Sequence, residues 1–555
     1  MKNIFIYILF VSLVGISFSC KDQLDIENPN QPIVAQATTE AGVIALAQGG
    51  VYVNGFKELK YYDGVPGYFW TGAIGFHELM GDVIGEEAAN IYGNQIGCPE
   101  YVILDNGTKV LNPNAPNKQM ALIRQININA NAGQNTLFYE WAYMYSMNNT
   151  CNAVLEFIVE IPFEGAADEK KSIIRAWVYW WKGFAYSRIG STYYAGVINS
   201  SSKVSTPTKP LNGNYVSKED IIAEANANFD LAADELAGLS DNATYQEIMS
   251  KLIPSFNRVG KGDIPTPEMW VRNINTMKAR NILVNTPVAD MTVAQWNEII
   301  TLTDAGILED DMVFTGRSTD NADFISATAG AIAPKSTGDP GSGITYKISE
   351  RLIQEFKPGD LRLDNNFDQL AAPWRGESSR GNSFNTRWEM LNGGNDIADV
   401  IVMSSRETGE YELYLASTHE ENVLMAAEAL INTGDIDGGL ALIDDLRTLQ
   451  GAGLADVSGT GLTLDEAKEE LRRERRIVMA FRGLSFYDAR RWGVIRDIAD
   501  GGGRTGAVVI DNDGQLNINA TINYNYLDYW DVPDTELVYN PPAAGSAPVK
   551  NPTGL

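Results

Sequence analysis

Hydrophobic residues recur every three or four positions in several long segments, which is the spacing of one face of an amphipathic α-helix. One such segment begins after Ser217, places Ile221, Ala225 and Phe229 on one face, and ends at Gly238. Serine before an acidic first turn is a typical helix start, and glycine is a typical helix end. The same spacing predicts further helices at 137–160, 170–189, 266–285, 292–306 and 463–482.

Two consecutive segments predict a helical hairpin. A helix capped at 417–420 continues to 434, and a partner helix follows from 435 to 451. The pair occupies about 34 residues, the length of a tetratricopeptide repeat, although the full consensus of that repeat is absent. The small residues Ala426, Ala427 and Ala429 would let the two helices approach closely.

Long stretches rich in Gly, Asn, Pro and Thr separate these helices. They are 82–118, 307–345, 358–411 and 497–555. Such stretches are too long to be simple connections in a compact protein, and long ordered loops on a helical scaffold often carry function. Since no Pro/Ser-rich linker divides the chain, we expect one large α-helical domain with irregular insertions at 46–555.

The N-terminus predicts export from the cytoplasm. Lys2 precedes an uncharged apolar run from Ile4 to Phe18, which has the length of a signal-peptide core and is short for a membrane span. The run ends at Ser19 and Cys20, a pair similar to a bacterial lipoprotein cleavage site. We therefore expect a signal peptide at 1–19 and lipidation of Cys20. The alternative is an ordinary secretory signal that leaves Cys20 as a free thiol.

After cleavage, residues 20–45 would form an acidic, lipidated tether and leader. No second apolar run is long enough to span a membrane, so the lipid would be the only membrane anchor.

Composition excludes several classes of function. The 555 residues include 43 Lys and Arg against 71 Asp and Glu, a formal charge of −28, which argues against nucleic acid as a partner. Three cysteines cannot form a disulfide scaffold, and we expect Cys98 and Cys151 to be buried thiols. With His77 and His419 as its two histidines, the chain lacks the material for histidine-rich metal sites.

Sequence signals for catalysis are weak. His77 and Glu78 lack the second histidine of a zinc-protease helix, and no nucleophile elbow or phosphate-binding loop is present. We therefore predict no enzyme activity and no cofactor. The segment Asp511–Gly514 is similar to part of a calcium loop without its final glutamate, so a structural calcium ion stays an open alternative.

The segment 473–493, RERRIVMAFRGLSFYDARRWG, resembles the signature of the SusD/RagB family, approximately E-R-R-x-E-L-A-F-E-G-x-R-F-x-D-L-x-R-W-G. Matching positions are Glu474, Arg475, Arg476, Ala480, Phe481, Gly483, Phe486, Asp488, Arg491, Trp492 and Gly493. The chain departs at Val478, Arg482 and Ser485, where two acids and one base of the pattern are missing. The local ion-pair network must therefore differ from that of the pattern.

Other segments resemble the same family in the same order along the chain. They are 145–155, 182–186 with 196–197, 424–429, and the C-terminal stretch 529–554. Together with the lipoprotein-like N-terminus, the resemblance extends over essentially the whole chain.

The resemblance implies a mainly α fold, in which tetratricopeptide-like helix pairs form a right-handed superhelical scaffold with long irregular loop insertions. It also implies a lipoprotein on the extracellular face of the outer membrane, where Asp22, Asp25 and Glu27 resemble a surface-export signal. Such a protein captures oligosaccharide, without cleaving it, for a TonB-dependent outer-membrane transporter of the SusC type. Alternatives are capture of peptide for the same kind of transporter and, less favoured, a surface glycoside hydrolase.

Aromatic side chains in polar, loop-like surroundings are the candidate ligand-binding residues, because aromatic faces stack on the apolar faces of sugar rings. They are Trp70, Tyr92, Trp374 and Trp388. For each of them the alternative is a partly buried loop anchor. Trp177, Trp180 and Trp181 lie at helical spacing and are expected in the core. We expect the arginines and acids of 472–491 to pair with one another along their helix and its exit.

Overall fold

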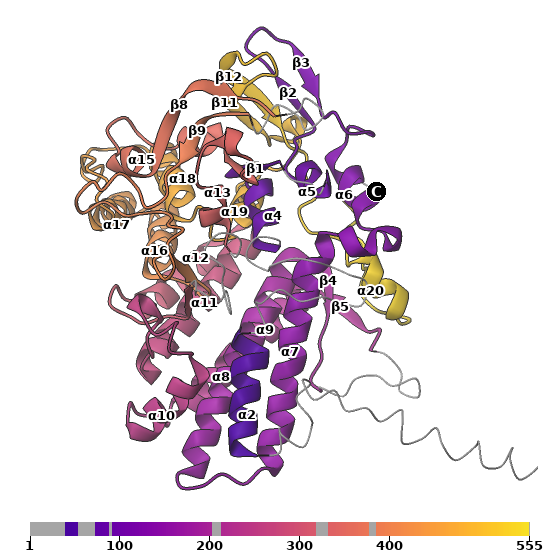
Figure 1. The fold of residues 1–555 in the computed structure, drawn as a ribbon, viewed down its shortest axis with the longest axis vertical. Helices are drawn as coiled ribbons and strands as arrows, with labels where there is room; N and C mark the ends of the chain where they lie inside the picture. Colours follow the sequence, from indigo (N-terminus) through magenta and orange to yellow (C-terminus); the bar gives the residue numbers. More distant parts are fainter. Residues whose placement is uncertain are drawn as a thin grey trace, which may run out of the picture.

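The computed structural model describes residues 39–53, 73–87, 91–201, 212–317, 331–376 and 385–553. The predicted signal peptide, Cys20 and Trp70 lie outside these ranges. The fold is mainly α, as predicted (Figure 1).

Long helices form the body of the molecule. They are α7 (Leu137–Glu160), α8 (Ala167–Thr192), α9 (Lys218–Leu236), α10 (Ala243–Leu252), α11 (Pro267–Asn285), α12 (Val293–Asp304), α16 (His419–Thr433), α17 (Ile436–Leu449) and α18 (Leu464–Val478). Successive helices pack against each other, as in the pairs α8 with α9, α11 with α12 and α16 with α17. The predicted helices and the predicted hairpin at 417–451 are therefore confirmed.

Shorter helices connect this body to the rest of the chain. They are α2 (Glu40–Leu46), α4 (Ala73–Met80), α5 (Ile91–Ile96), α6 (Gln119–Ile126), α13 (Ile332–Ser336), α14 (Glu350–Ile353), α15 (Leu361–Asn366), α19 (Ser485–Arg491) and α20 (Asp534–Tyr539), with a π-helical turn at Ala47–Val53 and short 3-10 turns between them. None of the helices in the described ranges has the length and apolar content needed to span a bilayer.

Local capping explains where several helices begin. The Thr463 side chain accepts from the Glu466 backbone N–H, and the Glu466 carboxylate accepts from the Thr463 backbone N–H. This capping box satisfies donors that the first turn of a helix otherwise leaves free. α18 ends at Val478, short of the predicted 482, because Phe481 and Gly483 adopt left-handed backbone angles, with φ of 66° and 72°. The signature segment thus consists of α18, a tight turn and α19.

Aromatic rings fill the centre of the helical body. Trp177, Trp180 and Trp181 on α8 are fully buried, as the helical spacing predicted. The ring of Trp181 lies 5.3 Å from that of Tyr52 and 5.5 Å from that of Phe314, measured between centroids. Cys98 and Cys151 are buried free thiols, which confirms their predicted role.

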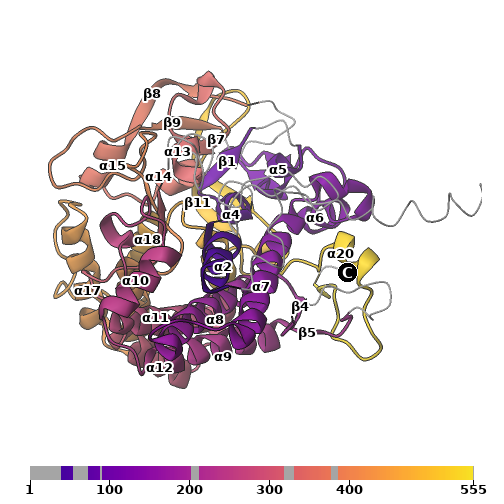
Figure 2. The ribbon, with the colours of Figure 1, turned by 60° about the horizontal axis from the view of Figure 1, so that its bottom comes forward.

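The long stretches between helices contain more strand than their composition suggested. The strands are β1 (Ile84–Glu86), β2 (Tyr101–Ile103), β3 (Lys109–Leu111), β4 (Ala195–Val197), β5 (Tyr215–Ser217), β6 (Thr315–Arg317), β7 (Tyr346–Ile348), β8 (Phe367–Trp374), β9 (Thr386–Met390), β10 (Glu412–Tyr414), β11 (Arg504–Ile510) and β12 (Leu516–Asn523). The order β11-β12-β2-β3 forms an antiparallel sheet at one end of the molecule (Figure 1). Figure 2 shows α8, α9, α11 and α12 gathered on one side and β7, β8 and β9 on the other.

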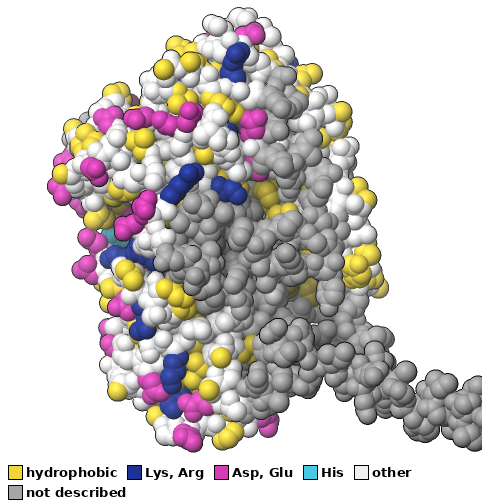
Figure 3. Space-filling model, viewed as in Figure 1, with side chains coloured by type: hydrophobic (Ala, Val, Ile, Leu, Met, Phe, Trp, Pro, Cys, Tyr) yellow, Lys and Arg dark blue, Asp and Glu magenta, His cyan; other side chains and the backbone are white. Residues whose placement is uncertain are grey.

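The acidic composition is visible at the surface. On the face drawn in Figure 3, Asp and Glu side chains are spread over the part of the molecule that carries α15 and α17. This distribution agrees with the formal charge of −28.

Candidate functional site

A groove opens beside the turn that joins α18 to α19. It consists of two adjoining chambers with volumes of about 370 Å³ and 220 Å³. Ile401, Tyr414, Glu420 and Gln450 line both chambers, so these residues form the wall that the chambers share.

Segments from several parts of the chain build this groove. β6 and β10 pair antiparallel, with Tyr414 opposite Thr315, and this pairing fixes the tyrosine at the groove wall. Glu420 lies in the first turn of α16, and Arg482 lies in the turn after α18. The stretches 307–345 and 358–411, which the sequence singled out as functional loops, both contribute residues to the groove.

The guanidinium group of Arg482 is stacked on the ring of Tyr414. Its Cζ atom lies 4.5 Å from the ring centroid, and its Nη1 donates to the Thr418 hydroxyl at 3.4 Å. Burial raises the pKa of Tyr414 to about 12, while the nearby Arg482 acts in the opposite direction. The phenol is therefore neutral and available as a hydrogen-bond donor at physiological pH.

Several polar groups line the first chamber. Within the ranges that the structure describes, no residue hydrogen-bonds to the hydroxyl of Tyr411, the hydroxyl of Tyr414 or the carboxylate of Glu410. Burial would raise the pKa of the Glu420 carboxyl, but Arg482 and local hydrogen bonds hold it below its usual value, so this acid is ionised. Neutral donors, anionic acceptors and aromatic carbon together suit a molecule rich in hydroxyl groups.

By contrast, the ion pair at one side of the groove is structural. Arg317 lies 2.9 Å from the Glu412 carboxylate, and it also donates to the carbonyl groups of Gly409 and Glu410 at 3.1 and 3.0 Å. These bonds hold the segment before Tyr411 against β6. Both Arg317 and Arg482 line the first chamber, but Arg317 pairs with a carboxylate and two carbonyl groups of the protein, whereas Arg482 stacks on Tyr414.

Two of the aromatic residues predicted from sequence, Trp374 and Trp388, do not line this groove. Trp374 and Trp388 lie on the hairpin of β8 and β9, where Trp374 is opposite Thr386. The ammonium group of Lys347 lies 4.7 Å from the centroid of the Trp374 ring and so covers one of its faces.

Trp388 is half-buried and packs against the main core, as expected for a loop anchor. Tyr92 belongs to α5, and Trp70 lies outside the described residues. A ligand-binding role for these four residues stays a prediction.

Sequence reasoning missed Tyr411, Tyr414 and Arg482. The two tyrosines lie in the segment EYELY, between a polar loop and the cap of α16, and this position was the available signal. Arg482 was grouped with the other arginines of 472–491, whose expected role was ion pairing. That role is correct for its neighbours, since Arg475 and Arg491 both pair with Asp488, at 2.8 and 2.7 Å.

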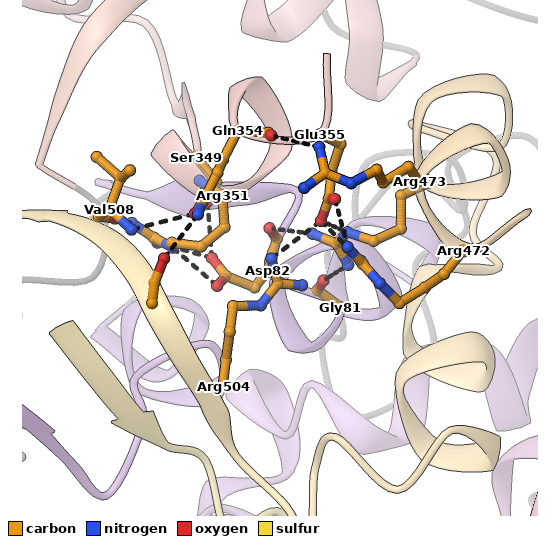
Figure 4. A network of polar contacts seen from close by, with 12 residues as sticks. Gly81, Asp82, Ser349, Arg351, Gln354, Glu355, Arg472, Arg473, Arg504 and Val508 are labelled. Carbon is orange, nitrogen blue, oxygen red and sulfur yellow. Dashed lines mark hydrogen bonds and ion pairs between the residues drawn. The ribbon is translucent and has the colours of Figure 1, made fainter. Parts of the chain in front are cut away.

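Two arginines of α18 and one of β11 form a network around Glu355 (Figure 4). The Glu355 carboxylate lies 2.7 Å from Arg472, 2.8 Å from Arg476 and 2.9 Å from Arg504. Burial would raise the pKa of Glu355, but these guanidinium groups hold it well below its usual range. The network joins α18 to β11 and to the end of α14, and we interpret it as scaffold.

The structure also places the candidate metal and catalytic residues. The Asp511 carboxylate accepts from the backbone N–H groups of Asp513 at 3.0 Å and Gln515 at 2.8 Å, which closes the turn between β11 and β12. His77 is buried, and its Nε2 lies 2.7 Å from Glu140. Across the described ranges, no three His, Cys, Asp or Glu side chains gather in a way that would hold a metal ion.

Comparison with known proteins agrees with this fold. Residues 421–544 match the family model of the SusD family. No curated protein matches the sequence.

Two crystal structures illustrate the likeness in fold. A SusD-like carbohydrate binding protein from Bacteroides vulgatus is 16% identical, with 92% of this chain and 98% of that chain covered and a TM-score of 0.54. A SusD homolog from Bacteroides thetaiotaomicron is 13% identical, with coverage of 83% and 91% and a TM-score of 0.51. The resemblance inferred from the signature segment is thus confirmed: the chain is similar to the SusD family in sequence over 421–544 and in fold over most of its length.

Proposed function

We propose that this chain is a cell-surface lipoprotein that binds oligosaccharide in the groove and delivers it to a TonB-dependent outer-membrane transporter of the SusC type. The observation that carries the proposal is the set of polar groups that line the first chamber: two tyrosine hydroxyls and the Glu410 carboxylate, which form no hydrogen bond with the described residues, and the stacked Arg482. The SusD-like fold supports it, because one structure with this fold is described as a carbohydrate binding protein.

The groove has the chemistry that a neutral sugar chain requires. Tyrosine hydroxyls both donate and accept, and ionised carboxylates accept from vicinal sugar hydroxyls. The first chamber, at about 370 Å³, falls within the roughly 300–1,000 Å³ of small-molecule pockets. Because the second chamber continues past Tyr414 and Glu420, a chain of sugars can occupy both.

Capture without cleavage is part of the proposal. Hydrolysis of a glycoside needs two carboxyl groups that flank the scissile bond. Glu412 is held by Arg317 at 2.9 Å, and Glu309, Glu410 and Glu420 are further acids along the groove, so the proposal of capture without cleavage is tested directly. Assays for released sugar therefore accompany each binding experiment.

The binding test uses isothermal titration of the chain that starts at Lys21. The titrants are oligosaccharides of glucose, xylose, mannose and fructose, an oligogalacturonide and a casein digest. We expect binding of one neutral class without sugar release. Release of sugar would favour a hydrolase, and binding of the digest alone would favour peptide capture.

Tyr411→Phe tests whether the observed binding uses this groove. Loss of one ligand hydrogen bond costs roughly 0.5–1.5 kcal/mol, or about threefold to tenfold in affinity. Tyr539→Phe is the matched control, since Tyr539 is 69% exposed on α20 and far from the groove in sequence. Equal affinities for both variants would exclude the groove as the binding site.

Lipid anchoring and delivery have separate tests. We expect Cys20→Ala to abolish incorporation of labelled palmitate and to release the protein from the membrane fraction, whereas Lys21→Ala keeps both. Affinity purification of the lipidated chain should recover a TonB-dependent transporter. We propose that the ligand is enclosed when the chain closes on that transporter.

A further inference from the structure

The carboxylate of Glu78 reaches the turn beside the groove from the buried side. Glu78 lies on α4 and is fully buried. Its Oε2 accepts from the Phe481 backbone N–H at 3.0 Å, and its Oε1 accepts from the Gly483 backbone N–H at 2.7 Å. The residue between these two donors is Arg482, which lines the groove and stacks on Tyr414.

The turn itself is strained and needs such support. Phe481 has a φ of 66°, and a left-handed angle costs a residue other than glycine about 1 kcal/mol or more. Gly483 has a φ of 72°, and a Cβ atom there would lie 2.7 Å from Cγ2 of Ile74 on α4. The backbone on both sides of Arg482 is therefore fixed against α4.

The Glu78 carboxylate binds these two backbone N–H groups without an ion pair to a described basic residue. Across the described ranges, no Lys, Arg or His side chain forms an ion pair with Glu78. Successive backbone N–H groups in such a turn form a small anion-binding concavity, and the carboxylate occupies it. Burial raises the pKa of Glu78 to about 7, although the backbone donors oppose that rise.

Glu78 also lies close to the ligand side of the turn. Burial raises the pKa of Tyr411 to about 12, Arg482 opposes the rise, and the charge of Glu78 adds to it. The charges of Arg482 and Glu78 thus both act on the hydroxyl of Tyr411, which lines the groove, although Glu78 itself is buried on α4.

We propose that Glu78 is a positioning residue of the groove. By accepting hydrogen bonds from the backbone N–H groups on both sides of Arg482, it holds the guanidinium group in the place from which it contacts the captured molecule. The role of Arg482 as a ligand contact rests on the proposed function, whereas its placement by Glu78 does not. The two are therefore tested separately.

The first experiment needs no ligand. Position 414 is labelled with 3-fluorotyrosine in the full secreted chain, and its ¹⁹F resonance reports the guanidinium that lies over the ring. We expect Glu78→Gln to move this resonance to the position that it has in Arg482→Ala, while a 3-fluorotyrosine label at Tyr539 is unaffected. A Glu78→Gln variant with native near-ultraviolet circular dichroism and the wild-type resonance would overturn the proposal.

Glu78→Asp keeps the charge and shortens the reach of the carboxylate. We expect a smaller shift of the same resonance, and this variant replaces Glu78→Gln if the latter does not fold. An unchanged resonance in a folded Glu78→Asp variant would also contradict positioning by Glu78.

The second experiment is a double-mutant cycle on binding. The probe is the mixture of glucose, xylose, mannose and fructose oligosaccharides in equilibrium dialysis. We expect Glu78→Gln to weaken binding about tenfold in the wild-type background and less than twofold in the Arg482→Ala background. Equal losses in both backgrounds would show that Glu78 acts by general stability and would overturn the proposal. Absence of binding by the wild type would reject the proposed function, and the ¹⁹F result would still decide the positioning.

Discussion

Two buried carboxylates near the end of α4 behave in opposite ways. Asp82 lies 2.7 Å from the Arg351 guanidinium, and although burial would raise its pKa, Arg351 lowers it to about 2. Glu78, one helical turn earlier, is held by backbone N–H groups, and burial raises its pKa to about 7. Among the described residues, a cation thus neutralises Asp82, whereas backbone donors hold Glu78, the residue that we propose to position Arg482.

The same contrast separates the Glu355 network from the turn after α18. On the side of Glu355, three arginines surround one acid, and the network is closed (Figure 4). Beside the groove, the Arg482 side chain stacks on the Tyr414 ring and, among the described residues, makes one hydrogen bond of 3.4 Å. Such an arginine fits the proposed role of a ligand contact.

The largest effect on stability is expected at the ion pair between Asp82 and Arg351. Arg351→Met leaves the Asp82 carboxylate buried without its cation, which typically costs about 3–5 kcal/mol. Guanidinium denaturation should show this loss in the free energy of unfolding. Arg473→Ala is the control, because its partner Glu469 is 46% exposed and such pairs contribute at most about 1 kcal/mol. Similar losses for both variants would contradict the contrast.

The two carboxylates predict opposite slopes of stability with pH. Asp82 has a lowered pKa, so it adds stability above about pH 4 that is lost as the pH falls toward 2. Glu78 has a raised pKa, so its contribution is present below about pH 4.5 and is lost as the pH rises through 7. One pKa unit corresponds to about 1.4 kcal/mol, so each slope is measurable by denaturation at several pH values.

Single variants separate these two contributions. We expect Asp82→Asn to flatten the acid part of the stability profile and Glu78→Gln to flatten the part between pH 4.5 and 7. If Glu78→Gln left the stability profile between pH 4.5 and 7 unchanged, another titratable group would be responsible for the slope there.

The smallest expected effects are on oligosaccharide binding, and they distinguish the groove from the hairpin of β8 and β9 as the binding site. Tyr414→Ala removes the shared wall of both chambers and should weaken oligosaccharide binding about tenfold. Trp374→Ala should change it less than twofold, because Lys347 already covers one face of that ring. Titration of both variants decides between the two sites, and the reverse order of effects would favour the residues predicted from sequence.

The helices were predictable because their signals are local. Capping residues such as Thr463 with Glu466, and apolar spacing as in 217–238, act within a few turns of chain. The four-stranded sheet was not predictable, because β2 is short and pairs with β12 across most of the chain. The groove was hidden for the same reason: Tyr414 and Arg482 meet only after β10 and the turn beyond α18 are placed by the fold.

That sheet has a consequence for how the chain is made. Asp105 donates its backbone N–H to Asn517, which is 412 residues later, and β2 pairs with β12. During synthesis, which proceeds from the N-terminus, the edge of β2 that pairs with β12 therefore stays unpaired until the last part of the chain is made. Unpaired edges promote association between chains, so a chaperone that delays folding would protect this protein until the final strands are present.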